Sequence, residues 1–103
     1  MIYLFDLDGT ICEEDGDFEN FTTEKDWHNY YTICKPIKDT IIKVRKLFLD
    51  NHTIIIWTAR WDKDFAVTKE WLERNLVPFH KLIMDKPMGD IYVDANCRRP
   101  EEL

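Results

Sequence analysis

Two carboxylates stand one residue apart near the start of the chain, at Asp6 and Asp8. They follow the apolar run 2–5 and are followed by Gly9 and Thr10. A short apolar run closed by Asp-Gly is typical of a buried strand that ends in a turn. Open α/β sheets build their sites at the carboxyl ends of their strands. The pair is therefore a candidate for acid–base chemistry or metal binding, although acids also end strands for turn formation alone.

Three further polar groups follow apolar runs in the same way. They are Thr58 after 53–57, Lys86 after 81–84 and Asp94 after 91–93. In a parallel sheet these strand ends converge on one edge, so residues far apart in the sequence become neighbours. The sequence thus predicts one site with a hydroxyl, an ammonium group and three carboxylates.

Such a set of groups suits phosphoryl transfer. A carboxylate that attacks a phosphate monoester approaches another anion, and two unit charges 4 Å apart repel by roughly 4 kcal/mol at an effective dielectric near 20. Cations must offset this repulsion. A lysine is one source of positive charge, and Mg²⁺ is another, since it binds one or two carboxylates together with water and substrate oxygens.

Alternating strands and helices must position these groups. We expect strands at 2–5, 53–57, 81–84 and 91–93, which implies a parallel α/β sheet with right-handed crossovers. Pro36 should open a helix that ends near Asn51, with its apolar face formed by Ile37, Ile41, Val44, Leu47 and Phe48. Asp62 or Asp64 should cap a second helix, which ends before Pro78. We expect a frayed tail from Arg98 to Leu103.

Residues 11–35 have a different character. The acidic run 13–17 lies between apolar residues and predicts a small hairpin or flap with a solvated turn. Residues 21–31 mix aromatic and polar side chains without a clear period, which fits either a short helix or an ordered loop.

Composition narrows the class of protein. A chain of 103 residues predicts a single domain, 1–103, and its formal charge of −6 argues against nucleic acid or an anionic membrane as a partner. The cysteines at 12, 34 and 97 form no CxxC pair, which favours reduced thiols and a cytoplasmic location. We expect neither a signal peptide nor a membrane span.

The motifs together resemble the haloacid dehalogenase (HAD) superfamily of phosphohydrolases. The resemblance rests on Asp6-Leu7-Asp8-Gly9-Thr10, Thr58-Ala59-Arg60, Lys86-Pro87 and Ile91-Tyr92-Val93-Asp94, and it covers nearly the whole chain outside 11–35. It implies a three-layer, Rossmann-like parallel sheet with flanking helices and a strand order of about 4-1-2-3. Only the flap and connecting segment 11–35 would stand in place of a cap domain.

The resemblance also implies roles for individual residues. Asp6 would be the nucleophile that forms a phosphoaspartyl intermediate, and Asp8 would protonate the leaving group and later activate water. Thr58 and Lys86 would stabilise the phosphoryl oxygens. The Asp6 side chain, the Asp8 carbonyl and Asp94 would hold Mg²⁺. The remaining substrate-binding candidates are Gly9, Thr10, Ala59 and Arg60.

Several positions leave alternatives open. Lys81 competes with Lys86 as the catalytic lysine, and Arg60 suits a substrate contact or a surface ion pair equally well. Asp90 precedes the last expected strand, about 13 Å from Asp94 along an extended chain, so it is a weaker metal candidate. Ala95 stands where the small-phosphatase branch usually has a second acid, which puts metal binding and catalytic efficiency in question.

The function that the resemblance implies is a capless, Mg²⁺-dependent phosphatase acting on a phosphate monoester. Its substrate would be a small phosphorylated metabolite or a nucleotide, and a homo-oligomer could cover the open site. One alternative is a nucleotide or nucleic-acid-end phosphatase. Another is a degenerate module that binds phosphate or a partner without turnover.

Overall fold

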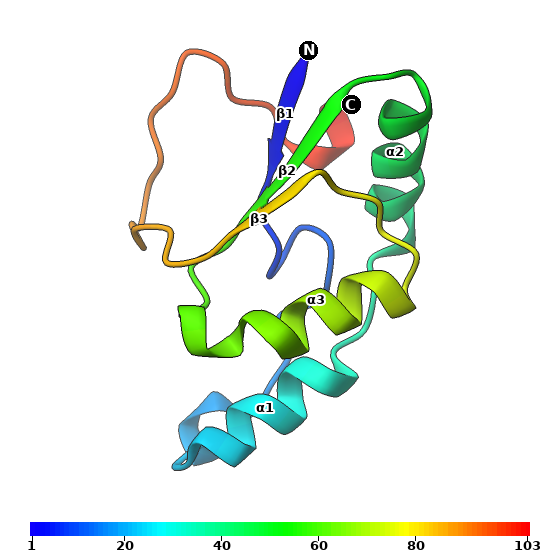
Figure 1. Cartoon of the computed structure of the whole chain (residues 1–103). Coiled ribbons are helices and arrows are strands. Elements are labelled where there is room, and N and C mark those ends of the chain that lie inside the picture. Colours follow the sequence, from blue (N-terminus) through cyan, green and yellow to red (C-terminus); the bar gives the residue numbers. More distant parts are fainter.

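The chain forms a small parallel sheet with helices between its strands (Figure 1). The computed structural model describes all 103 residues. The strands are β1 (Ile2–Phe5), β2 (Thr53–Trp57) and β3 (Lys81–Ile83), in the order β1-β2-β3. The helices are α1 (Glu24–Ile33), α2 (Lys38–Leu49) and α3 (Phe65–Arg74). Short 3₁₀ helices span Phe18–Asn20, Asp62–Asp64 and Pro100–Glu102.

The three strands are parallel, so all of their carboxyl ends lie at one edge. Phe5 is paired with Ile56, and Trp57 is paired with Ile83. The chain crosses from β1 to β2 through α1 and α2, and from β2 to β3 through α3. This arrangement confirms the predicted parallel α/β class and the strands at 2–5 and 53–57, and the third strand ends at Ile83, one residue before the predicted end of 81–84.

The core lies on one face of the sheet. Phe5, Ile54 and Ile56 are buried and join Val44 of α2 and Leu72 of α3 in one apolar cluster. The opposite face of β1 is open, because Ile2 is 65% exposed and Leu4 is 54% exposed. The expected three-layer architecture is therefore wrong: burial on a single face corresponds to two packed layers.

The predicted fourth strand is absent from the sheet. The segment that contains Ile91 and Val93 has no strand pairing, and these two side chains are 81% and 93% exposed. The order 4-1-2-3 is accordingly wrong. Parallel strands are stabilised by burial of both faces. No layer covers the open face of β1, so a fourth strand beside β1 would leave one of its faces exposed.

Within residues 11–35 the chain forms helix α1, so the short helix, and not the ordered loop, is the correct alternative for 21–31, and no hairpin forms at 13–17. Thr23 caps α1 by accepting a hydrogen bond from the Asp26 N–H, while the Asp26 carboxylate accepts one from the Thr23 N–H. This reciprocal capping box satisfies the free amides at the helix start. Cys12 makes only isolated bridges, one with Asp8 and one with Pro36.

The other boundaries follow the sequence closely. Helix α2 begins two residues after Pro36, and Asn51 adopts the left-handed conformation (φ 68°) that ends the turn. Asp64 precedes α3 without a side-chain capping bond. The tail is less frayed than expected, since Lys43 Nζ donates to the Pro100 carbonyl at 2.6 Å. None of the helices has both the length and the apolarity needed to cross a membrane.

Candidate functional site at the carboxyl edge of the sheet

Three of the predicted polar groups come together where β1, β2 and β3 end. The Thr58 N–H donates to the Ile83 carbonyl at 3.0 Å, and the Lys86 N–H donates back to the Thr58 carbonyl at 2.9 Å. These bonds hold the segment after β3 beside the segment after β2. Lys86 Nζ lies 3.9 Å from Asp6 Oδ1, so the chain after β3 also reaches the chain after β1.

Asp6 and Lys86 form a partly buried ion pair. Burial raises the pKa of Asp6, and the Lys86 charge offsets part of that rise. The Lys86 ammonium lies over two aromatic rings, 5.0 Å from the Trp57 centroid and 4.5 Å from the Tyr92 centroid. Such cation–π contacts favour a cation that has lost part of its hydration. Lys86, rather than the exposed Lys81, is therefore the lysine at this edge.

The loop after β1 is closed by its own backbone. The buried Leu7 carbonyl accepts hydrogen bonds from the N–H groups of Thr10, Ile11 and Cys12. Gly9 adopts a positive φ of 82° and donates its N–H to the Cys12 carbonyl at 2.7 Å. The Gly9 and Thr10 amides, which the sequence suggested for substrate binding, are thus engaged within the loop. The Asp8 N–H and the Asp8 carbonyl have no partner in the chain.

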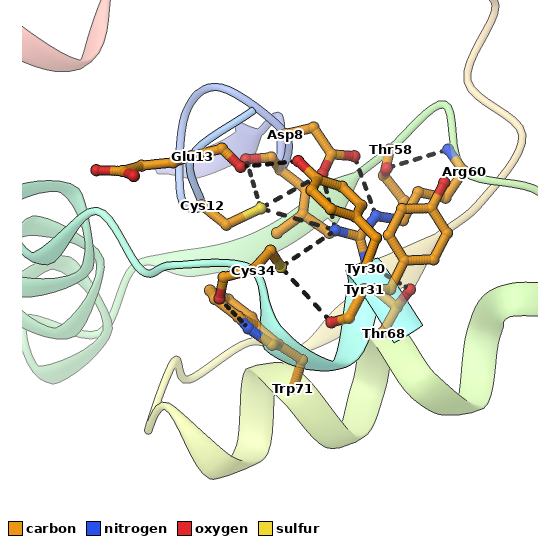
Figure 2. A network of polar contacts seen from close by, with 11 residues as sticks. Asp8, Cys12, Glu13, Tyr30, Tyr31, Cys34, Thr58, Arg60, Thr68 and Trp71 are labelled. Atoms are coloured by element: carbon orange, nitrogen blue, oxygen red, sulfur yellow. Dashed lines mark hydrogen bonds and ion pairs between the residues drawn. The ribbon is translucent and has the colours of Figure 1, made fainter. Parts of the chain in front are cut away.

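Asp8 is held by Arg60, a residue 52 positions away (Figure 2). Arg60 Nε donates to Asp8 Oδ2 at 3.0 Å, and Arg60 Nη2 donates to Asp8 Oδ1 at 2.7 Å. Paired, two-point contacts of this kind are the strongest geometry between a guanidinium and a carboxylate. The alternative of a surface ion pair is therefore wrong, because Arg60 forms a buried ion pair with Asp8 within the site.

Arg60 is only 4% exposed, and every part of its guanidinium has a partner. Its Nη1 donates to Thr68 of α3 at 3.0 Å, and its Cζ lies over the Tyr31 ring, 3.8 Å from the ring centroid (Figure 2). Burial disfavours its charge, but the hydrogen bond and negative charge of Asp8 outweigh that effect and raise the pKa of Arg60. The Arg60 N–H also donates to Thr58 Oγ1 at 3.1 Å.

Two thiols complete the surroundings of this ion pair. Arg60 Nη2 lies 3.7 Å from Cys12 Sγ and 3.8 Å from Cys34 Sγ. Cys12 Sγ also donates to Asp8 Oδ1 at 3.4 Å. These thiols, with Tyr31 and Thr68, were not among the predicted site residues, because no local motif marks contacts made across the fold.

Glu14 is a third acid near the loop. Burial raises the pKa of Glu14, and the charges of Asp8 and Asp6 raise it further. A Cβ placed on Gly9 would lie 3.3 Å from Glu14 Oε2, so the side chain extends over the loop at Gly9. The sequence suggested only a solvated flap turn at this position.

Asp94 does not join the site. It is exposed, and its Oδ1 accepts the N–H of Asn96 at 2.9 Å in a local turn. Asp90 is exposed too, as is Ala95. No group of three or more His, Cys, Asp or Glu side chains is arranged to hold a metal ion. Of the three residues predicted to hold the metal ion, Asp6 and Asp8 lie at this edge of the sheet and Asp94 does not.

The donors that are present still fit one type of metal ion. The Asp6 carboxylate and the unpartnered Asp8 carbonyl offer two oxygen ligands on one loop. Mg²⁺ often keeps several waters and binds proteins through only one or two carboxylates, with substrate phosphate oxygens supplying further ligands. The Asp6 carboxylate and the Asp8 carbonyl are thus the groups at this edge that could hold such an ion.

Solved structures resemble the fold, whereas no protein-family model and no curated protein matches the chain. An MCSG target protein from Vibrio cholerae is 24% identical with a TM-score of 0.74, over 98% of this chain and 85% of that one. A chain of the Pnkp1/Rnl/Hen1 complex is 16% identical with a TM-score of 0.62, over 92% of this chain and 30% of that one. At these identities the likeness concerns the fold alone, and this chain spans less than a third of the length of the chain from the complex.

Proposed function

We propose that this protein is a phosphatase of the HAD type that hydrolyses phosphate monoesters. The observation that carries the proposal is the meeting of Asp6 with Lys86, 3.9 Å apart, beside Thr58 at one sheet edge. A nucleophilic carboxylate, a cation for the phosphoryl oxygens and a hydroxyl donor are the protein groups that the reaction needs. Mg²⁺ bound to Asp6 and the Asp8 carbonyl would neutralise phosphate charge.

In the first step, an Asp6 oxygen attacks phosphorus and the ester P–O bond breaks. Lys86 lies close enough to Asp6 to contact the transferring phosphoryl group, and the unpartnered Asp8 N–H is a further donor. Thr58 is only 1% exposed and its Oγ1 accepts the Arg60 N–H, so its hydroxyl would donate from the buried side of the site. Removing Lys86 would leave two anions in contact without the nearest protein cation, so it would raise the barrier.

Asp8 would carry the proton to the leaving oxygen and later take one from water. Its Oδ1 already accepts hydrogen bonds from Arg60 Nη2 and Cys12 Sγ, whereas Oδ2 accepts only one, from Arg60 Nε. Oδ2 therefore keeps a lone pair that can hold the proton. Arg60 acts as a positioning residue, because it fixes the direction of that oxygen.

A second function has support from the same geometry. Arg60 already engages both carboxylate oxygens of Asp8, and Asp94 supplies no ligand to the site. These two features favour a module that binds phosphate without turnover. The small-molecule class remains the preferred ligand, since the charge of −6 opposes binding to a phosphate polymer.

Hydrolysis of p-nitrophenyl phosphate and a panel of sugar phosphates and mononucleotides, with Mg²⁺, tests the proposal. Asp6→Asn should lower kcat/KM by about 100-fold or more, because it removes the nucleophile. Asp90→Asn is the matched control and should retain wild-type activity, because Asp90 is exposed outside the site.

The two functions give different results. Phosphate binding in calorimetry without Asp6-dependent hydrolysis of any substrate would favour the binding module and overturn the enzyme proposal. Asp6-dependent hydrolysis with release of inorganic phosphate would exclude the binding module.

A further inference from the structure

A pair of buried thiols lies against the ion pair that positions Asp8. Cys12 is fully buried in the loop after β1, and Cys34 is 5% exposed at the end of α1. Both sulfurs contact the same guanidinium nitrogen, Arg60 Nη2, at 3.7 and 3.8 Å (Figure 2). The third cysteine, Cys97, is exposed elsewhere. The candidate site for oxidation is thus a defined pair and not a single thiol.

The backbone brings the two cysteines side by side. Residues 11–13 and 35–37 run antiparallel: the Glu13 N–H donates to the Lys35 carbonyl at 2.8 Å, and the Ile37 N–H donates to the Ile11 carbonyl at 2.7 Å. Cys12 is paired with Pro36, so Cys34 is its diagonal neighbour on the same face. Diagonal neighbours have Cα atoms about 7–8 Å apart, slightly beyond the roughly 4.4–6.8 Å of disulfides.

We propose that Cys12 and Cys34 form a reversible disulfide under oxidation by a hydroperoxide, and that this bond displaces Arg60 from Asp8. The second half of the proposal rests on the proposed function for its effect on catalysis. The first half stands on the position of the two sulfurs alone.

The reaction balances with a hydroperoxide as oxidant. The Cys34 sulfur attacks a peroxide oxygen, the O–O bond breaks, and the products are a sulfenic acid and water or an alcohol. The Cys12 sulfur then attacks the Cys34 sulfur. The S–S bond forms, the S–O bond breaks, and the hydroxyl leaves as water with the Cys12 proton. The two sulfurs together lose two electrons, which the peroxide gains.

Two observations make Cys34 the thiol that reacts first. Cys34 lines a surface pocket with Gly16, Tyr30 and Lys35, whereas Cys12 lies behind it in the core. Interaction with the Cys12 thiol, against the opposing effect of burial and with help from the Arg60 charge, lowers the pKa of Cys34 to about 7. A thiol with more thiolate character is oxidised more readily.

Disulfide formation must disturb Arg60. An S–S bond is about 2.0 Å long, so the two sulfurs must approach one another and the backbone at Cys34 must move by an amount on the order of 1 Å. Cys12 also loses the S–H group that donates to Asp8 Oδ1. A displacement of this size at a positioning group lowers catalytic rates severely.

Peptide mapping after treatment of the folded protein with hydrogen peroxide, followed by alkylation of free thiols, tests the bond itself. We expect a Cys12–Cys34 linked peptide that has lost two hydrogen atoms and that dithiothreitol cleaves. Cys97→Ser, the matched control, should form the same link, and Cys34→Ser and Cys12→Ser should not. Circular dichroism establishes that each variant is folded.

Two readouts test the consequence. The Trp71 indole N–H donates to the Cys34 carbonyl at 2.8 Å, so oxidation should change tryptophan fluorescence in Cys97→Ser and not in Cys34→Ser. Oxidised Cys97→Ser should lose about tenfold or more of its phosphatase activity, recovered with dithiothreitol.

The possible results separate the two proposals. A linked peptide in a protein that hydrolyses nothing supports the disulfide and overturns only the phosphatase proposal. Oxidation that stops at Cys97, gives Cys97-linked dimers, or leaves Cys34 as an unlinked sulfinic acid overturns the disulfide. A linked protein with full activity overturns the displacement of Arg60.

Discussion

Arg60 is the residue on which the candidate site depends most. It is the only side chain that joins Asp8 of the first loop, Thr68 of α3 and the Tyr31 ring of α1. A charge buried in this way is stabilised only by its partners, so removal of one partner leaves the other uncompensated. The same contacts that orient Asp8 therefore contribute to folding.

Arg60→Met should lower the free energy of unfolding by about 3 kcal/mol, because it leaves the Asp8 carboxylate without its buried partner. Urea denaturation measures this change. Asp8→Asn with Arg60→Met should lose less than the sum of the two single changes, since both remove the same interaction. Additive losses would show that the ion pair contributes no coupling.

Asp6→Asn should stabilise the protein at neutral pH. Burial raises the folded pKa of Asp6, with Lys86 offsetting part of the rise, so the folded state favours the protonated form. Wild-type protein is destabilised once the pH rises through that folded pKa, and the neutral amide avoids this. The advantage of Asp6→Asn should disappear as the pH falls below the ordinary aspartate value of 3.8.

Urea denaturation across this pH range, without divalent metal ions, measures the effect. The exposed Asp90→Asn serves as control and should follow the wild type at every pH. An advantage of Asp6→Asn that does not depend on pH would contradict the electrostatic explanation.

At the scale of the elements, the turns that end the helices set where the next strand starts. Asn51 after α2 and Leu76 after α3 both adopt positive φ, at 68° and 56°. Asparagine tolerates this conformation, whereas a leucine there is strained. The end of α3 thus carries a local backbone cost that the end of α2 avoids.

Leu76→Gly should be more stable than Leu76→Ala by about 1 kcal/mol, because only glycine relieves the left-handed strain. The leucine is 70% exposed, so little apolar burial is lost in either variant. Thermal denaturation of the two variants measures the difference. At Glu73, inside α3, we expect the opposite result: Glu73→Gly should be less stable than Glu73→Ala. If glycine were the less stable residue at both positions, strain at Leu76 would be ruled out.

At the scale of the whole molecule, the core and the C-terminal segment are distinct. All twenty buried residues lie between Phe5 and Leu82, and the chain after β3 adds none. The segment 87–99 has no helix or strand. Stability therefore resides in the part of the chain that ends with β3 and Lys86.

A nonspecific protease should cut the folded protein first within residues 87–99, because few contacts hold this segment against the rest of the protein. Mass spectrometry identifies the cuts, and circular dichroism should show that the remaining fragment keeps its helices. Protein unfolded in urea is the control, in which cuts should spread over the chain. Early cuts within β1 or β2 of the folded protein would contradict this division.

The sequence by itself determined several local elements and the acid pair of the candidate site. Strand 53–57, the helix after Pro36 and the Asp6-x-Asp8 pair at a strand end all follow from short-range patterns of apolar residues, turn residues and caps. Parallel strand order then brought the Lys86 side chain to Asp6 and the Lys86 backbone to Thr58.

Only the tertiary structure decided the contacts that span the chain. The pairing of Asp8 with Arg60, the approach of Cys12 to Cys34 and the open face of β1 depend on how separate elements pack. The same is true of 91–93, whose apolar pattern suits a strand although the sheet provides no second layer to bury it. Local patterns report propensity, whereas burial and ion pairing depend on neighbours distant in sequence.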